Sequence, residues 1–261
     1  MLKDLNRTAR NLKFRVGSLS QSVKNFSSSP IDAKNFIILT RERSGSTCLL
    51  DLLSFHSNIL SDPHTFYNYT NLPREFKFKR VYSKKNIRGY KFKVQPSSFD
   101  TTNQNLAKAE KGIKSLSDNG IFIIHLEREN LIKQAVSWLM ADSTKKQNYR
   151  KGERPIKLKS MYFDPDTLLK RIRIFESISN FEHKVLTNSP HLYLSYEKDL
   201  MLEENHQLVL DKICNFLDIK SSKVITRYAR LSSGKLDESI SNYEEIHDFL
   251  KNTKYFNQLF Y

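Results

Sequence analysis

The segment that most constrains the fold runs from Phe36 to Phe55, where an apolar stretch meets a short basic loop that opens at once into a leucine-rich stretch. This order predicts a buried strand, a tight loop and a helix. Arg41 and Arg43 bring positive charge to the loop, and Gly45 lets the backbone come close to a ligand. The N–H groups of the first helical turn point to the same place, so the loop is typical of a phosphate or sulfate site.

Further polar groups follow in the loop, which continues Ser44, Gly45, Ser46, Thr47 and Cys48. A loop that binds a nucleoside triphosphate requires Gly-Lys-Ser/Thr, in which the lysine reaches the terminal phosphates and the hydroxyl binds magnesium. This chain has no Gly-Lys-Ser/Thr. The loop therefore predicts an anion other than ATP or GTP, with an ordinary serine-rich turn as the alternative.

The strong positive charge of the chain suggests an anionic partner. The formal net charge is +15, and basic patches bind nucleic acid by releasing counterions from the phosphate backbone. A polyanionic cofactor with an anionic glycan or a membrane surface explains the charge equally well. Because the basic residues are spread along the chain without an RNA-recognition or zinc-finger motif, we expect no nucleic-acid partner.

The cysteines and the N-terminal segment add little chemistry. Cys48 and Cys214 are the only cysteines, each within an apolar helical pattern, and no metal-binding spacing accompanies them. No apolar stretch reaches the roughly 18 residues that a membrane span requires, so we expect a cytoplasmic protein, with peripheral contact at a membrane as an alternative. Residues 1–34 are basic and serine-rich. They suit a transit peptide, a membrane-surface helix or a plain basic lead-in, and we favour the lead-in.

The rest of the chain, residues 35–261, alternates between strand-like and helix-like patterns and predicts one α/β domain. Its sheet is expected to be mostly parallel and flanked by helices. The predicted strands are 36–40, 90–94, 121–126 and 192–195, and the predicted helices are 47–55, 106–116, 131–139, 167–182 and 210–217. Ligands of such sheets bind at the carboxyl ends of the strands, where Arg43 and Arg128 both lie.

Two motifs together resemble the cofactor site of sulfotransferases that use 3′-phosphoadenosine 5′-phosphosulfate (PAPS). Arg-Ser-Gly-Ser-Thr at 43–47 is similar to the loop that binds the 5′-phosphosulfate. Arg128 and Ser137 resemble the arginine and serine that hold the 3′-phosphate, although their spacing is one residue longer than is common in the family. The resemblance implies a P-loop-like sulfotransferase fold with PAPS as the co-substrate and no metal.

Two later segments extend the resemblance to the C-terminus. The run LYLSYEKDL at 192–200 is similar to a strand-end motif of the family, which places Tyr196 near the adenine and lets Glu197 orient the backbone. The segment 233–256 resembles nodulation-factor-type carbohydrate sulfotransferases. The implied reaction is in-line transfer of a sulfuryl group to a hydroxyl of a glycolipid, oligosaccharide or polysaccharide, with segments 67–82 and 141–163 choosing the acceptor.

The family also implies a cation at the leaving group and a base at the acceptor. Arg43 is the expected catalytic cation, and His64 is the expected base because it occupies a position that is acidic in related enzymes; Asp62 is the second choice. Lys91 and Lys93 face either the acceptor or solvent, and His56 is expected to be structural. The alternative function is a catalytically inactive protein of the same fold that binds adenosine bisphosphate or another polyanion. A small-molecule kinase with a degenerate loop is a third, and the oligomeric state stays open.

Overall fold

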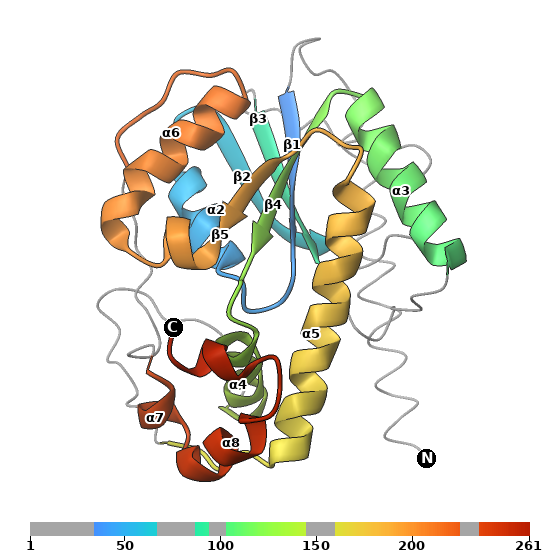
Figure 1. The fold of residues 1–261 in the computed structure, drawn as a ribbon. Coiled ribbons are helices and arrows are strands. Elements are labelled where there is room, and N and C mark those ends of the chain that lie inside the picture. Colours follow the sequence, from blue (N-terminus) through green and yellow to red (C-terminus); the bar gives the residue numbers. More distant parts are fainter. Residues whose placement is uncertain (1–33, 67–86, 94–102, 145–159, 225–234) are drawn as a thin grey trace, which may run out of the picture.

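The computed structural model describes residues 34–66, 87–93, 103–144, 160–224 and 235–261. At its centre lies a five-stranded sheet in the order β2-β3-β1-β4-β5, and every pair of neighbouring strands is parallel (Figure 1). Helices cover the sheet, so the predicted α/β class with a parallel sheet is confirmed. Within these ranges no helix is long and apolar enough to cross a bilayer.

The predicted elements are present, with ends that differ by a few residues. The strands are β1 (Lys34–Thr40), β3 (Ile87–Lys93), β4 (Ile121–Glu127) and β5 (Leu192–Ser195). The helices are α2 (Ser46–Ser54), α3 (Asn103–Asp118), α4 (Leu131–Thr144), α5 (Pro165–Leu186) and α6 (His206–Phe216). The C-terminal part forms α7 (Leu236–Ser239) and α8 (Tyr243–Leu250), followed by a 3-10 turn at Phe256–Leu259.

One strand is missing from the sequence prediction. β2 (Ile59–Phe66) lies at the edge of the sheet, and its pairing with β3 shifts register between Ser61 and Thr65. Its sequence contains Pro63 among polar residues, and proline in a sheet is tolerated at edges and irregularities. The irregular segment therefore has no alternating pattern from which a strand could be predicted.

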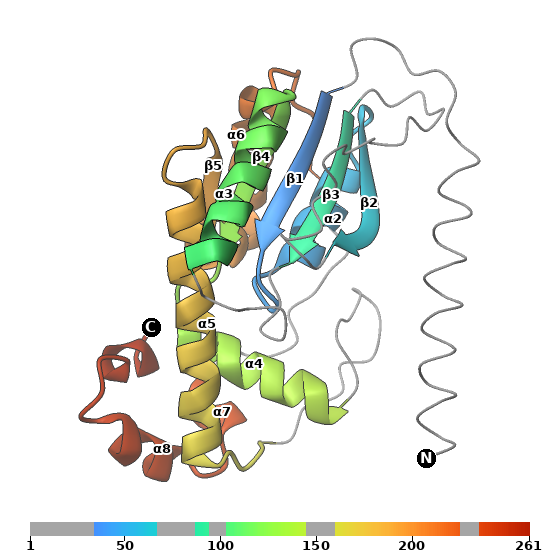
Figure 2. The ribbon, with the colours of Figure 1, turned by 90° about the vertical axis from the view of Figure 1, so that its right-hand side faces the viewer.

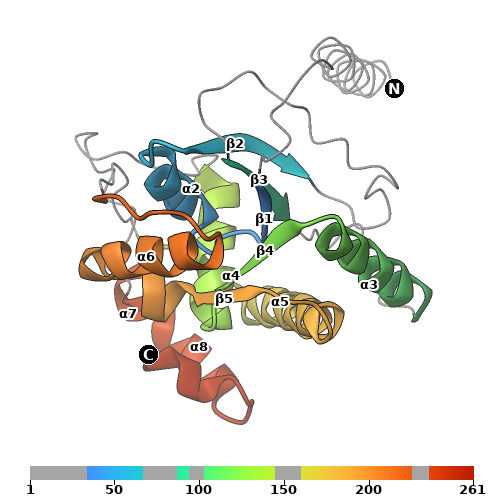
Figure 3. The same cartoon turned by 90° about the horizontal axis from the view of Figure 1, so that it is seen from above.

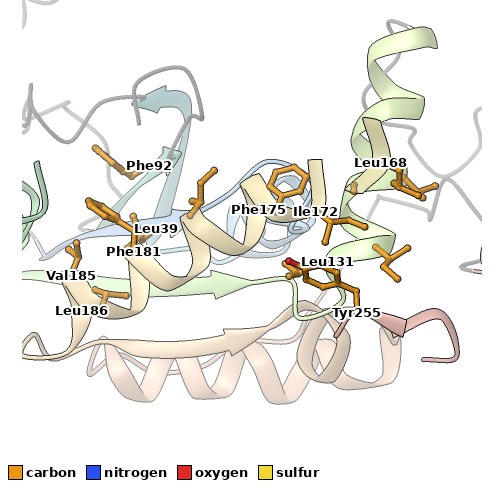
Figure 4. Close-up of a cluster of buried hydrophobic side chains, with 14 of the residues drawn as sticks. Leu39, Phe92, Leu131, Leu168, Ile172, Phe175, Phe181, Val185, Leu186 and Tyr255 are labelled. Carbon is orange, nitrogen blue, oxygen red and sulfur yellow. The ribbon is translucent and has the colours of Figure 1, made fainter. Parts of the chain in front are cut away.

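The alternation of side chains along β1 separates two cores. Phe36 and Ile38 pack with α2 and α6 on one face, whereas Ile37 and Leu39 pack with α3 and α5 on the other (Figure 3). The second core continues past the sheet, where Phe175 and Ile172 of α5, Leu131 of α4 and Tyr255 lie close together (Figure 4).

Helix α4 lies beyond the carboxyl ends of the strands, beside the lower half of the long helix α5 (Figure 2). The segment that begins at residue 160 returns to the C-terminal part, since Met161 bridges Ile240 and the N–H of Ser241 donates to the Met161 carbonyl at 2.8 Å. The segment before α5 is therefore tied to the C-terminal part of the chain.

Gly89 on β3 is required by the ring of Phe36, its partner on β1. A Cβ atom at Gly89 would lie 2.1 Å from Cζ of that fully buried ring. We expect Gly89→Ala to lower the free energy of unfolding by about 1–3 kcal/mol, because a packed core does not yield to an extra methyl group without strain. Urea unfolding of Gly89→Ala, Phe36→Leu and the double variant measures the coupling. Additive effects in the double variant would contradict this explanation.

Candidate functional site

The loop between β1 and α2 is curled by two residues in the left-handed region. Arg43 has φ 62° and Gly45 has φ 84°. Gly45 also lies against the ring of Tyr196, since a Cβ atom there would come within 2.5 Å of Tyr196 Cδ2. Positive φ at an arginine is uncommon and persists where surrounding contacts determine it. The loop is thus held in a conformation that only a glycine at position 45 permits.

Arg43 in this loop is in contact with Arg128, an arginine that is distant in sequence and follows β4. Nη1 of Arg128 donates to the carbonyl oxygen of Arg43 at 3.1 Å, and Nε of Arg43 donates to Oγ of Ser137 at 3.0 Å. Burial and then the charge of Arg128 lower the pKa of Arg43, while Glu42 and Tyr196 oppose the shift. Two partly buried guanidinium groups of like charge make a local positive potential at which an anion is stabilised.

Tyr196 and Glu197 hold Arg128 from the other side. The guanidinium carbon of Arg128 lies 4.9 Å from the centre of the Tyr196 ring, and its Nε lies 3.6 Å from Oε1 of Glu197. Glu197 also accepts from the backbone N–H groups of Glu129 at 2.9 Å and Asn130 at 3.3 Å. These bonds agree with the expectation that Glu197 orients the backbone. The contact of Tyr196 with adenine stays a prediction.

Helix α4 fastens the loop through side chains on one of its faces. Nε2 of Gln134 donates to the Glu42 carbonyl at 2.7 Å and to Ser44 Oγ at 3.1 Å, and Nε1 of Trp138 donates to Oε2 of Glu42 at 2.6 Å. Gln134, Ser137 and Trp138 share this face because they are three and four positions apart. Gln134 and Trp138 were missed in the sequence, where Trp138 is typical of a packed apolar position and helical spacing was the only signal.

The C-terminal residues complete the start of α4, beside Arg128. Oδ1 of Asn130 accepts from the N–H of Lys133 at 2.8 Å, and Oε1 of Gln258 accepts from the N–H of Leu131 at 2.8 Å. Nδ2 of Asn130 donates to the carbonyls of Gln258 at 2.7 Å and Tyr261 at 3.2 Å. Since the first N–H groups of a helix need such acceptors, the tail fixes the turn that carries Arg128.

Arg41 requires a correction. It was predicted to contact the cofactor, but its side chain is fully buried and turns away from the loop. Its Nη2 lies 2.7 Å from Oε1 of Glu127, its Nε lies 3.4 Å from Oε2 of Glu182, and its Nη1 donates to the Phe175 carbonyl at 2.9 Å. A guanidinium enclosed by protein groups in this way neutralises carboxylates of the core rather than a ligand.

Glu127 is the centre of this buried network. It accepts from the hydroxyls of Ser179 and Tyr193, the latter at 3.1 Å, and pairs with Nε2 of His183 at 2.9 Å. Burial alone would raise the pKa of Glu127, but Arg41, then the Ser179 hydroxyl and the neighbouring histidines, outweigh it and lower the pKa to about 2. Burial, and then the carboxylates of Glu127 and Glu129, raise the pKa of Tyr193. Glu127 is therefore ionised throughout the physiological range.

The remaining predicted residues lie as follows. Ser44 and Ser46 are buried, whereas Thr47 and Cys48 on the first turn of α2 are half-buried. His64 and Asp62 lie in the irregular part of β2, but their side chains, like that of Lys93, fall outside the described residues, so the identity of the base stays a prediction. His56 is structural as expected: Nδ1 accepts from the N–H of Asn58 at 3.1 Å, and Nε2 lies 2.9 Å from the Lys220 carbonyl.

Other expectations fall on parts of the chain that the structure leaves out. Residues 1–33, the whole of 67–82 and most of 141–163 are among them, so the lead-in and the acceptor-choosing segments stay predictions. Among the described residues, no group of three or more histidine, cysteine, aspartate or glutamate side chains is arranged to hold a metal ion.

Comparison with known proteins gives little beyond the geometry. No protein-family model matches the sequence. No curated protein matches it either. Among solved structures, a sulfotransferase from Alicyclobacillus acidocaldarius is similar, with a TM-score of 0.49 and 12% identity over 87% of this chain and 94% of that chain. Because the identity is low and the superposition partial, the fold assignment rests on the strand order and the parallel pairing.

Glu127 is expected to make stability depend on acid. Because its pKa is about 2 in the folded chain and higher in the unfolded one, its contribution is complete above about pH 5 and is lost as the pH falls toward 2. We expect Glu127→Gln to lower the free energy of unfolding by about 3 kcal/mol at pH 7, because it leaves Arg41 incompletely paired.

Urea unfolding of the wild type and Glu127→Gln between pH 7 and pH 3 measures this difference, which should shrink as the pH falls. The matched control is Glu204→Gln, an exposed carboxylate in the turn before α6. A difference between Glu127→Gln and the wild type that stays constant across the range would show that the charge of Glu127 is not what stabilises the network.

Proposed function

We propose that this chain is a sulfotransferase that uses PAPS and transfers the sulfuryl group to a hydroxyl of a carbohydrate. The observation that carries the proposal is the convergence of Arg43, Ser137 and Arg128 at the carboxyl ends of β1 and β4. All three had been selected from the sequence for the two anionic ends of PAPS. Their meeting from separate segments of the chain supports a ligand with more than one anionic group.

The residues divide between the two ends of the nucleotide. The N–H groups at the start of α2, with Ser46 and Thr47, suit the 5′-phosphosulfate, because the N-terminus of a helix favours an anion. Arg128 and Ser137 suit the 3′-phosphate through charge-assisted and neutral hydrogen bonds. Arg43 would connect the two groups of residues, since it belongs to the loop that leads into α2 and contacts Ser137 by its side chain and Arg128 by its carbonyl.

PAPS, when bound, supplies an activated sulfuryl group with a phosphate as its leaving group. The protein's part is to hold the acceptor oxygen in line with the sulfur, to stabilise charge on the departing phosphate oxygen and to take the acceptor proton. Arg43 would stabilise that oxygen as the bond from sulfur to the phosphate breaks and the bond from the acceptor oxygen forms. His64, or Asp62 in its place, would accept the proton.

The proposed acceptor is a carbohydrate, and it is defined only as a broad class. We infer a glycolipid, oligosaccharide or polysaccharide hydroxyl from the resemblance of the C-terminal segment, and peripheral membrane contact or a dissolved glycan would both suit the charge of +15. Nucleic acid is not proposed as a partner.

The proposal predicts that both arginines are required for turnover. With labelled PAPS and a panel of glycans, the wild type should release adenosine 3′,5′-bisphosphate only when an acceptor is present. We expect Arg43→Ala to lower kcat/KM by about 10²–10³-fold, the effect of removing a donor from a developing charge. Arg128→Ala should lower kcat/KM mainly through a higher KM for PAPS, because the 3′-phosphate that it is proposed to bind keeps the same charge throughout the transfer. Ser137→Ala should lower it less, because it removes a neutral donor.

The control is Arg173→Ala, an exposed arginine on α5 whose loss should leave turnover unchanged. Wild-type turnover in both Arg43→Ala and Arg128→Ala would show that the site is wrongly placed. Tight binding of adenosine 3′,5′-bisphosphate without transfer to any acceptor would favour the catalytically inactive alternative.

A further inference from the structure

We infer that the buried ion pair between Arg41 and Glu127 positions the cofactor site, by fixing the distance between Arg43 and Arg128. Neither Arg41 nor Glu127 would touch the nucleotide. This inference rests on the proposed function, because it assigns the two site arginines to a ligand with two separate phosphate groups.

The strand register places the pair where the two arginines leave the sheet. β1 and β4 are parallel neighbours in which Thr40 is opposite Leu126. Arg41 follows Thr40, Glu127 follows Leu126, and the two side chains meet at 2.7 Å. Arg43 is two residues beyond Arg41, and Arg128 directly follows Glu127. The pair therefore joins the two backbones at the last point before each turns toward the site.

Both members of the pair are held rigidly. The side chain of Arg41 is 0% exposed and that of Glu127 is 7% exposed. The other contacts of Arg41 come from Glu182 and the Phe175 carbonyl on α5, and those of Glu127 from Ser179 and His183 on α5 and from Tyr193 on β5. The ion pair between β1 and β4 is thus also bound to α5 and β5. We therefore expect it to stay in place when the loop moves.

Stability alone does not account for such a pair. Removing two charges from water costs about as much as their attraction returns, and well-packed apolar residues often replace a buried ion pair without loss. What apolar residues do not supply is a fixed direction and length between two strand ends, because packing is less directional than a hydrogen-bonded ion pair. A buried ion pair is therefore suited to a place where the segment that follows it must keep one defined conformation.

The loop after Arg41 must keep such a defined conformation. Arg43 takes a positive φ of 62°, and its carbonyl must face Arg128 while its side chain faces Ser137. Downstream, the loop is fixed by Gly45 against Tyr196. The pair of Arg41 with Glu127 is the corresponding anchor upstream, so the strained residue lies between two fixed points.

The test compares a ligand with two phosphate groups and a ligand with one. Calorimetry on the full chain measures adenosine 3′,5′-bisphosphate and adenosine 5′-monophosphate binding to the wild type, Arg41→Lys and Glu127→Gln. We expect both variants to lose about tenfold to a hundredfold in affinity for the bisphosphate, the effect of losing one hydrogen bond to a charged group. Their affinity for the monophosphate should change far less, because one phosphate does not depend on the distance between the arginines.

Two further variants separate positioning from folding. Tyr193→Phe removes, at an exposed residue, the hydroxyl that lies 3.1 Å from Oε2 of Glu127 and 3.2 Å from Oε1 of Glu129, and it should lower the affinity ratio in the same direction by a smaller factor. Glu176→Gln removes a carboxylate of α5 that pairs instead with Lys254 and Tyr255, and it should leave the ratio unchanged. Thermal melting of each variant reports its stability.

The outcomes are distinct. A lower ratio in Arg41→Lys, Glu127→Gln and Tyr193→Phe, with Glu176→Gln unchanged, supports the inference. An unchanged ratio in the folded variants, even with lower melting temperatures, would make the pair merely structural and overturn it. If Arg41→Lys does not fold, Glu127→Gln and Tyr193→Phe decide the question. A wild type that binds the two nucleotides equally would contradict the proposed function itself, and the inference with it.

Discussion

The arrangement of the site depends on one buried cation. The guanidinium of Arg41 lies between Glu127 of β4 and Glu182 of α5, where none of the three side chains is more than 7% exposed. Charges in that position are tolerated only when they are paired and hydrogen-bonded, so the ends of β1 and β4 and the C-terminal half of α5 have little freedom to move apart. Because α4 packs on α5 and fastens the loop through Gln134, this restriction extends from the core to the loop itself.

In contrast to that paired charge, the charges of the loop repel each other. Arg43 and Arg128 have like charge and touch through the carbonyl of Arg43, and burial together with this repulsion lowers the pKa of Arg43. Glu197 and the ring of Tyr196 relieve Arg128, and Glu42 relieves Arg43, only in part. Local arrangements that cost stability are common at functional sites and are supported by the structure around them. Arginine thus has two opposite roles here. Arg41 is neutralised by carboxylates in the core, whereas Arg43 and Arg128 lie together with like charge at the candidate site.

The sequence predicted the fold well where the patterns are regular. Apolar runs at 36–40 and 121–126 and the helical spacing of Leu131, Ala135 and Leu139 correspond to β1, β4 and α4. Arg128 and Ser137 were chosen by their resemblance to the arginine and serine of PAPS-dependent sulfotransferases, and the structure brings them to the loop. The edge strand β2 was not predicted, because a proline and a register shift interrupt its alternation.

Arg41 was misassigned for a different reason. Arg41 and Arg43 carry the same charge and lie only two residues apart in one basic loop, so the sequence does not distinguish them. Which of them faces the ligand depends on the direction of each side chain, and that direction is set by the carboxylates of Glu127 and Glu182 from distant segments. A buried acid at the end of β4 and another within the apolar face of α5 were the available signals, since carboxylates in such places need a cationic partner.

The pair of residues Tyr196 and Glu197 extends the same logic to the far side of the site. The ring of Tyr196 lies against Gly45 and under the guanidinium of Arg128, while Glu197 binds the backbone that follows Arg128. The short turn after β5, Tyr196–Leu200, therefore contacts both the loop between β1 and α2 and the segment after β4 that carries Arg128. Under the proposed function, a nucleotide base that displaced or stacked on this ring would affect both segments at once, because they share the ring as a packing surface. Recognition of the base and of the phosphates would then be coupled through contacts that the protein already makes.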